Sequence, residues 1–263
     1  MRLAYRALLV LLLLLAASDN TPALAADGVQ TPPSQLGLPS YYTKYIDASG
    51  IPIIANGAVD DAALYKMQRI VNVMLERDAS VRQQVRARLR RVLIIPRNEG
   101  MTSLPEYTNL DQTAPIAGAT WNQRAQGVAW TDNLPYVSCS EANQLHSGYP
   151  QDRYTDESIC IHEMAHTVFD AGIVFRDTDA ANRLTALYKA AVKRGALGNT
   201  YAGTNTSEYW AESVQAWFNA ASCGNPSNTP VCTQKALQQS DPLLWNEIKQ
   251  WFPMPTQPAT LYP

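Results

Sequence analysis

The sequence of 263 residues is poor in histidine, has no excess of basic residues and contains a single long apolar run. The chain has 21 lysine and arginine residues and 23 acidic residues, and the net charge of -2 argues against nucleic acid as the main partner. After the apolar run near the N-terminus, no second stretch has the length of a membrane span. Internal repeats and low-complexity segments are also absent, so we expect one well-buried domain.

Residues 1–25 have the pattern of a secretory signal peptide. Arg2 and Arg6 give a positive end, residues 7–17 are apolar, and Ala23-Leu24-Ala25 resembles a cleavage site. The apolar run is too short to span a bilayer as a retained helix. We therefore expect the mature chain to be secreted or periplasmic, without stable membrane insertion. An uncleaved N-terminal anchor is the alternative.

Cysteine is absent from the first half of the chain, and all four cysteines follow: Cys139, Cys160, Cys223 and Cys232. In an exported chain an even count favours two disulfides over a thiolate metal site, whose usual spacings are not present. Three pairings are open. We favour the two pairs that are adjacent in sequence, because the second pair brackets a short loop. Without an earlier cysteine, a latent form would need residues 26–60 to cover the active site sterically.

Two of the three histidines, His162 and His166, lie in an H-E-x-x-H pattern. On an α-helix, positions four apart share a face, so both imidazoles can point at one ion. Glu163 then lies beside the ion, where its carboxylate can take a proton without ligating the metal. The pattern predicts a catalytic zinc ion (Zn2+), with Glu163 as the general base.

A catalytic zinc ion takes three protein ligands and leaves a fourth position open. Glu208 and Glu212 lie four apart on a largely apolar helix predicted for residues 206–219. One carboxylate would bind the ion, and the other would accept a hydrogen bond from a ligating histidine. A closed site with a fourth protein ligand, for which His146 is the rival candidate, would instead indicate a non-catalytic secreted binding module with a structural metal.

Several motifs together resemble a known group of peptidases: the H-E-x-x-H run, Asp170, Tyr201-Ala-Gly-Thr-Asn205 and Glu208-Tyr-Trp-Ala-Glu212. They are similar to the catalytic domain of anthrax lethal factor and to the Pro-Pro endopeptidases, which are secreted zincin metallopeptidases. The resemblance covers about residues 156–220. It implies an α+β, mainly helical zincin-like domain with a small sheet beside the histidine helix. It also implies a zinc metalloendopeptidase that acts on a protein or peptide substrate.

The same resemblance implies roles for individual residues. His162, His166 and Glu208 would bind zinc, Glu163 would be the general base, and Tyr201 would donate a hydrogen bond to the oxyanion. Glu212 and Asp170 would lie behind the ligands and support them.

Other features leave the substrate open. The first hundred residues match none of these peptidases, so no cleavage specificity is implied. A zinc-dependent amidase acting on cell-wall or glycan-linked substrates is the alternative, because the many Tyr and Trp residues can stack on sugar rings. Trp121 and Trp130 are candidates to line a substrate groove. The glycosylation sequon at Asn205 lies inside the site motif, and we expect it to be unused.

Hydrophobic spacing and turn formers divide the rest of the chain. We expect an irregular arm over residues 26–40 and one domain over 41–263, with an N-terminal lobe of about 41–135 and a catalytic part of about 136–263. Strand 136–139 is predicted to be the edge strand beside the cleft. The other predicted elements are strands 51–54 and 91–96 and helices starting at Asp61 and Ala79 and covering 178–194 and 243–252.

Overall fold

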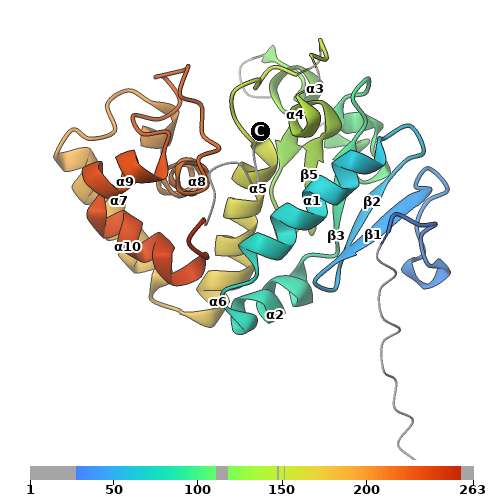
Figure 1. The fold of residues 1–263 in the computed structure, drawn as a ribbon, viewed down its shortest axis with the longest axis horizontal. Coiled ribbons are helices and arrows are strands. Elements are labelled where there is room, and N and C mark those ends of the chain that lie inside the picture. The colour runs from blue at the N-terminus through green and yellow to red at the C-terminus, as the bar shows by residue number, and fades with distance from the viewer. Residues whose placement is uncertain (1–27, 111–117, 147, 151, 256–263) are drawn as a thin grey trace, which may run out of the picture.

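The structure is a computed structural model that describes residues 28–110, 118–146, 148–150 and 152–255. The signal peptide expected at residues 1–25 lies outside the described residues. The fold is α+β, as predicted, with mostly helical structure around one five-stranded sheet (Figure 1). No helix within the described ranges is both long enough and apolar enough to cross a membrane.

The sheet has the strand order β1-β2-β3-β5-β4. β1 (Lys44–Ala48) runs antiparallel to β2 (Ile51–Ala55), which pairs in parallel with β3 (Arg91–Ile95). β3 pairs in parallel with β5 (Tyr136–Ser140), and β4 (Gly127–Val128) adds an antiparallel edge. The central strands consist mainly of buried apolar residues because hydrophobic clusters cover the sheet on both faces.

The edge strand beside the cleft is β4, so the prediction that strand 136–139 forms that edge is wrong. Gly127 permits the extra strand, because a Cβ at this position would lie 2.7 Å from the carbonyl oxygen of Ser138. The same Cβ would lie 2.9 Å from Cγ of Glu163. Side chains do not approach so closely, so only glycine lets β4 pack this tightly against its neighbours.

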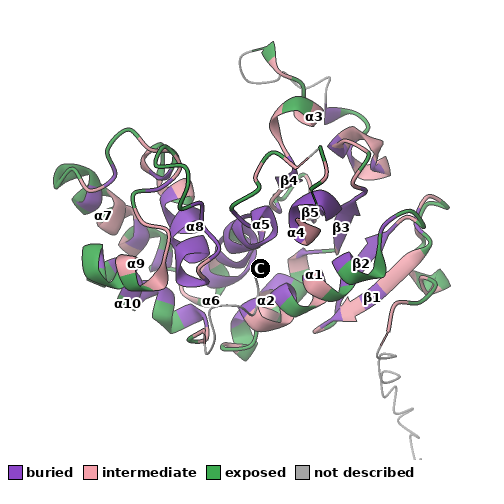
Figure 2. Cartoon of the chain, turned by 45° about the horizontal axis from the view of Figure 1, so that its top comes forward, coloured by how far each residue is buried: buried purple, intermediate pink, exposed green. Residues whose placement is uncertain are grey.

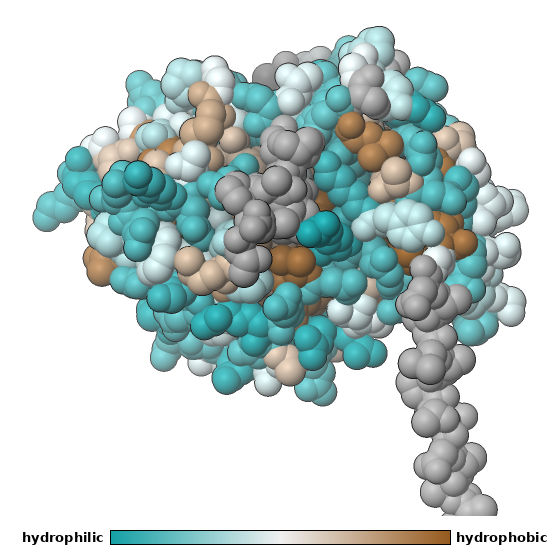
Figure 3. Space-filling model, viewed as in Figure 1, coloured by the Kyte–Doolittle hydropathy of each residue, from teal (hydrophilic) through white to brown (hydrophobic). Residues whose placement is uncertain are grey.

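The N-terminal helices begin where the sequence predicts. α1 (Asp61–Met74) starts after Asp60, whose side chain accepts a hydrogen bond from the backbone N–H of Ala62. Asp78 caps α2 (Ala79–Arg88) in the same way. Both helices bury an aliphatic stripe in the main core. Hydrophilic residues cover most of the face shown in Figure 3, where hydrophobic residues form separate patches.

α5 (Ile159–Val168) lies in the middle of the molecule and is mostly buried (Figure 2). A disulfide between Cys139 and Cys160 ties its first turn to β5. On its other side, the indole N–H of Trp210 donates to the carbonyl oxygen of Ala165 at 3.0 Å. α5 is therefore fixed from both sides.

The chain continues from α5 into the C-terminal helices. A π-helical turn, Phe169–Ile173, and α6 (Val174–Arg176) come first. A second disulfide joins Cys223 to Cys232, and both pairs are those favoured from the sequence. α8 (Thr206–Trp217) packs against α5, and α7 (Ala180–Lys193), α9 (Gln234–Ser240) and α10 (Pro242–Trp251) pack around α8.

The N-terminal arm lies along β1, at the opposite end of the sheet from β4. Gln30 exchanges two backbone hydrogen bonds with Tyr45, at 2.9 and 2.8 Å. The arm thereby covers part of an edge strand that would otherwise present unpaired backbone groups. Of the described residues 28–60, none lines the main cleft. This placement argues against a latent form in which these residues block the active site.

Candidate metal centre

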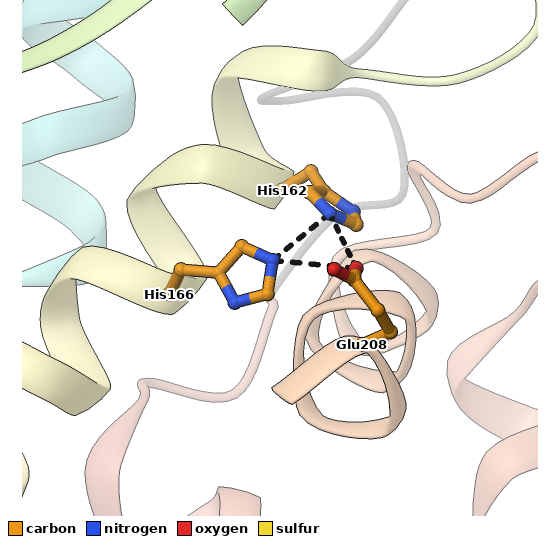
Figure 4. A group of neighbouring side chains, drawn as sticks. All are labelled: His162, His166 and Glu208. Atoms are coloured by element: carbon orange, nitrogen blue, oxygen red, sulfur yellow. Dashed lines mark hydrogen bonds and ion pairs between the residues drawn. The ribbon is translucent and has the colours of Figure 1, made fainter. Parts of the chain in front are cut away.

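Three candidate ligands from two helices converge on one point (Figure 4). α5 carries His162 and His166 one turn apart, and Glu208 lies in the first turn of α8. Asn205 caps α8: its side-chain oxygen accepts a hydrogen bond from the backbone N–H of Glu208 at 2.9 Å. The cap fixes the turn from which the carboxylate reaches the imidazoles.

The three ligand atoms, here called the ligand triangle, are nearly equidistant. Nε2 of His162 lies 3.1 Å from Nε2 of His166 and 3.1 Å from Oε2 of Glu208. The third side, from His166 Nε2 to Glu208 Oε2, is 3.4 Å. Ligands about 2.0–2.1 Å from a tetrahedral zinc ion are separated by about 3.3 Å. The triangle therefore fits three of the four ligands of such a site.

The surroundings of the ligand triangle favour a positive charge. Burial alone would lower the pKa of His162, but the nearby carboxylates, first Glu208 and then Glu163, raise it to about 10. Burial would raise the pKa of Glu208, yet its contacts with the histidines hold it well below its usual range. Oε2 of Glu208 is buried without a well-aligned hydrogen-bond donor among the described residues. A divalent cation would satisfy this oxygen and both ring nitrogens, so the residues present fit a metal ion.

Gln215 sets the tautomer of His162. Its Oε1 lies 2.9 Å from Nδ1 of the ring, while its Nε2 donates to the carbonyl oxygen of Ser158 at 3.1 Å and to Oε2 of Glu157 at 3.3 Å. An amide nitrogen can only donate, so the amide oxygen must face the ring and Nδ1 must carry the proton. Nε2 is therefore the ring nitrogen that would give its lone pair to a metal ion when the ion displaces its proton.

We expected Glu212 to accept a hydrogen bond from a ligating histidine, but in the structure Gln215 accepts the one from His162. Oε1 of Glu212 lies 3.5 Å from Nδ1 of His162, which is an ion-pair distance. Burial raises the pKa of Glu212 to about 7, although the charge of His162 opposes this shift. Gln215 follows Glu208 by seven residues and so shares its helix face; this spacing is the signal that sequence reasoning missed.

Ser207 orients the second histidine. Its Oγ lies 2.8 Å from Nδ1 of His166. Asp170, expected behind the ligands, lines the cleft but makes no hydrogen bond to either imidazole among the described contacts. The first turn of α8 thus supplies both Glu208 and the partner of His166.

Replacing Gln215 by leucine is expected to weaken zinc binding by about 10- to 100-fold. Leucine fills a similar volume but cannot accept the proton of His162 Nδ1, so the ring loses its fixed tautomer and orientation. Competition with a chromophoric chelator measures the affinity, and thermal unfolding of the same sample checks the fold. Gln238→Leu, at an exposed position of α9, is the matched control. Wild-type affinity in Gln215→Leu would contradict the assignment.

Glu163 is held beside β4, in the same cleft as the ligand triangle. Burial raises its pKa, and the histidine charges and a hydrogen bond from the backbone of Ala129 oppose this rise. The backbone N–H of Trp130 donates to Oγ1 of Thr167 at 3.1 Å, which fixes the segment after β4 to α5. The segment beside the carboxylate is thus held against α5.

Tyr201 reaches the site from a short 3-10 helix, η7 (Tyr201–Gly203), that precedes α8. Its ring lies over that of His162, with centroids 6.3 Å apart and planes inclined by 28°. Partial burial, and then the carboxylate of Glu208, raise the pKa of Tyr201. The hydroxyl therefore stays protonated and able to donate a hydrogen bond.

The ligand triangle, Glu163 and Tyr201 line one cleft of about 590 Å³. Trp121 and Trp130 line it as well, as the sequence suggested, together with Tyr154. His146 lies elsewhere, and its Nδ1 is 3.1 Å from Oδ2 of Asp152. Within the described residues the metal-binding group consists of the two histidines and Glu208, without a fourth protein ligand.

The fold and the ligand triangle together define an α+β protein with a His-His-Glu group that could hold a metal ion. Among solved structures, the chain is similar to the Pro-Pro endopeptidase from Paenibacillus alvei, with a TM-score of 0.52 and 18% sequence identity. The match covers 76% of this chain and 97% of that chain. Neither the protein-family models nor the curated proteins give a match. The likeness therefore confirms the predicted resemblance at the level of the fold.

Proposed function

We propose that this chain is a zinc-dependent endopeptidase. The observation that carries the proposal is the grouping of Glu163 and Tyr201 with the ligand triangle in one cleft, where they supply a base and a hydrogen-bond donor. The fold that it shares with a Pro-Pro endopeptidase supports this reaction class. The sequence identity is low, so no preference for a particular peptide bond is carried over.

Each site residue has its own role in the proposed hydrolysis. His162, His166 and Glu208 would hold a zinc ion, which when bound lowers the pKa of water and polarises a carbonyl group. Glu163 takes the proton from the attacking water and then passes it to the leaving amine. The hydroxyl of Tyr201 donates to the oxygen that becomes negative in the transition state.

The edge strand β4 offers a place for an extended substrate. β4 pairs with β5 on one side, and Gly127, Val128 and Ala129 line the cleft on the other. A peptide can add to such an edge through main-chain hydrogen bonds, which recognise the backbone whatever its side chains. A peptide placed along β4 would pass beside Glu163, which packs against Gly127.

Export of the protein remains part of the proposal. Two disulfides close within the described residues, and such bonds persist in oxidising compartments outside the cytoplasm. The expected signal peptide agrees with this. A secreted or periplasmic enzyme would meet its substrate there.

An amidase that acts on cell-wall or glycan-linked substrates is the second candidate. It is favoured by Trp121 and Tyr154, whose rings line the cleft and could stack on sugars. The same base and donor would serve either amide bond. Product analysis on wall fragments and on peptides, in parallel, separates the two.

The proposal is tested with purified protein, loaded with zinc and incubated with a diverse peptide library. We expect new peptide termini in the mass spectrum, their loss on chelation and their return when zinc is added. Stoichiometric zinc together with no cleavage of any peptide would count against a peptidase. Release of wall fragments under the same conditions would favour the amidase.

A further inference from the structure

The second disulfide closes a short surface loop, residues 223–232, which we call the clamp loop. Its end residues, Cys223 and Cys232, have Cα atoms 5.1 Å apart. Residues 223–227 of the loop are exposed, whereas Val231 and Cys232 at its end pack against the main core. Polar contacts at three places hold it between the segment before α5 and the segment before α8.

The first contact is with the backbone that carries Tyr201. The N–H of Tyr201 donates to the carbonyl oxygen of Ser227 at 2.7 Å, and the N–H of Ala202 donates to that of Asn228 at 2.8 Å. The side chain of Tyr201 is 46% exposed, so packing alone does not fix its ring. The position of the hydroxyl therefore depends on where the clamp loop holds this backbone.

The second contact is with the wall of the cleft. Nδ2 of Asn228 donates to Oε1 of Glu157 at 2.9 Å, and its Oδ1 accepts from Nδ2 of Asn225 at 3.0 Å. Both amide atoms are engaged, so the side chain has one orientation. Glu157 is 3% exposed and lines the cleft, which makes it a firm anchor.

The third contact anchors the start of the clamp loop. The carboxylate of Asp156 accepts hydrogen bonds from the backbone N–H of Gly224, at 3.0 Å, and from the hydroxyl of Ser222. Asp156 and Glu157 lie directly before α5, and Tyr201 lies shortly before α8. The clamp loop thus bridges the two helices that supply the ligand triangle.

We propose that the clamp loop is a positioning element that holds the Tyr201 hydroxyl at the ligand triangle, with Asn228 as its central positioning residue. The inference rests on the proposed function, which gives Tyr201 its role as a donor. The disulfide restricts the conformations of an otherwise exposed loop and so keeps its carbonyl groups in place. Misplacing a catalytic donor by about 1 Å can cost about 100-fold in rate.

The proposal is tested in the full chain by removing the disulfide of the clamp loop, with Cys223→Ser combined with Cys232→Ser. We expect kcat to fall about 10- to 100-fold, with little change in KM and with unchanged zinc content. Tyr201→Phe should also lower kcat. Adding it to the opened clamp should cost no more than Tyr201→Phe alone, because both changes remove the same hydroxyl contact. Lys235→Ala, an exposed residue just beyond the clamp loop, is the control.

Amide hydrogen exchange gives a readout that needs no activity. The amides of Tyr201 and Ala202 should exchange faster once the clamp is open, while those of α5 keep their protection. If the double cysteine variant fails to fold, Asn228→Ala with the disulfide intact should show the same pattern more weakly. The proposal is overturned if exchange at Tyr201 is unchanged, if the loss of kcat on opening the clamp loop adds fully to that of Tyr201→Phe, or if the variant loses zinc. If the wild type cleaves nothing, the proposed function fails, and the exchange data still decide whether the clamp holds Tyr201.

Discussion

Glu163→Gln is expected to lower kcat by about 10²- to 10⁴-fold while the zinc content stays at the wild-type level. Glutamine keeps the shape of glutamate but cannot take a proton from water. The group of candidate metal ligands does not include Glu163, so the substitution leaves the ligand triangle intact. Its stem packs against Gly127, a contact that glutamine preserves. Substrate binding along β4, and hence KM, should change little.

Steady-state kinetics on a peptide from the library, with elemental analysis of the same samples, measures both quantities. Glu76→Gln, at an exposed position after α1, is the matched control and should behave as the wild type. A Glu163→Gln enzyme with wild-type kcat would show that another group takes the proton. Loss of zinc in this variant would instead mean that Glu163 supports the metal.

Long amphipathic segments were predictable because their apolar spacing repeats over several turns. α1 and α10 begin within one residue of their expected positions, and β3 ends within one residue of its own. β4 was not predicted because it has two residues and therefore no period; it exists through its pairing with β5. The same pairing moved β5 from the edge to the interior of the sheet. Strand order thus depended on a close approach that only Gly127 allows.

In the candidate site, too, the local features were predictable from the sequence and the long-range contacts were not. His162, Glu163 and His166 share one turn, so a local pattern was sufficient to identify them. Gln215 contacts His162 across 53 residues. Its spacing from Glu208 puts it on the same helix face, but this spacing alone does not show which distant side chain it meets. The sequence predicted that a disulfide closes the clamp loop, but the contact of this loop with Tyr201 arises only when the two segments fold against each other.

Removal of zinc is expected to lower the free energy of unfolding by about 4 kcal/mol when the free zinc concentration is about 1,000 times its Kd. Under the proposed function the ion would bind only the folded chain, because the ligand triangle is assembled from two separate helices. His162→Ala should abolish this zinc-dependent increment, because it removes one of the three ligands. It also leaves Glu208 and Glu212 without the imidazole that lies 3.1 and 3.5 Å from their oxygens. Denaturant unfolding with and without zinc measures the increment.

His146→Ala is the matched control for this measurement, because His146 pairs with Asp152 outside the ligand triangle. It should keep the full zinc-dependent increment, even if its overall stability falls when that pair is lost. The comparison separates the general cost of losing a histidine from the specific loss of a metal ligand. If the increment survives His162→Ala but disappears in His146→Ala, the metal lies beside His146 at the C-terminal end of α4 (Glu141–Leu145), away from Glu163. The proposed peptidase would then have no zinc beside its base.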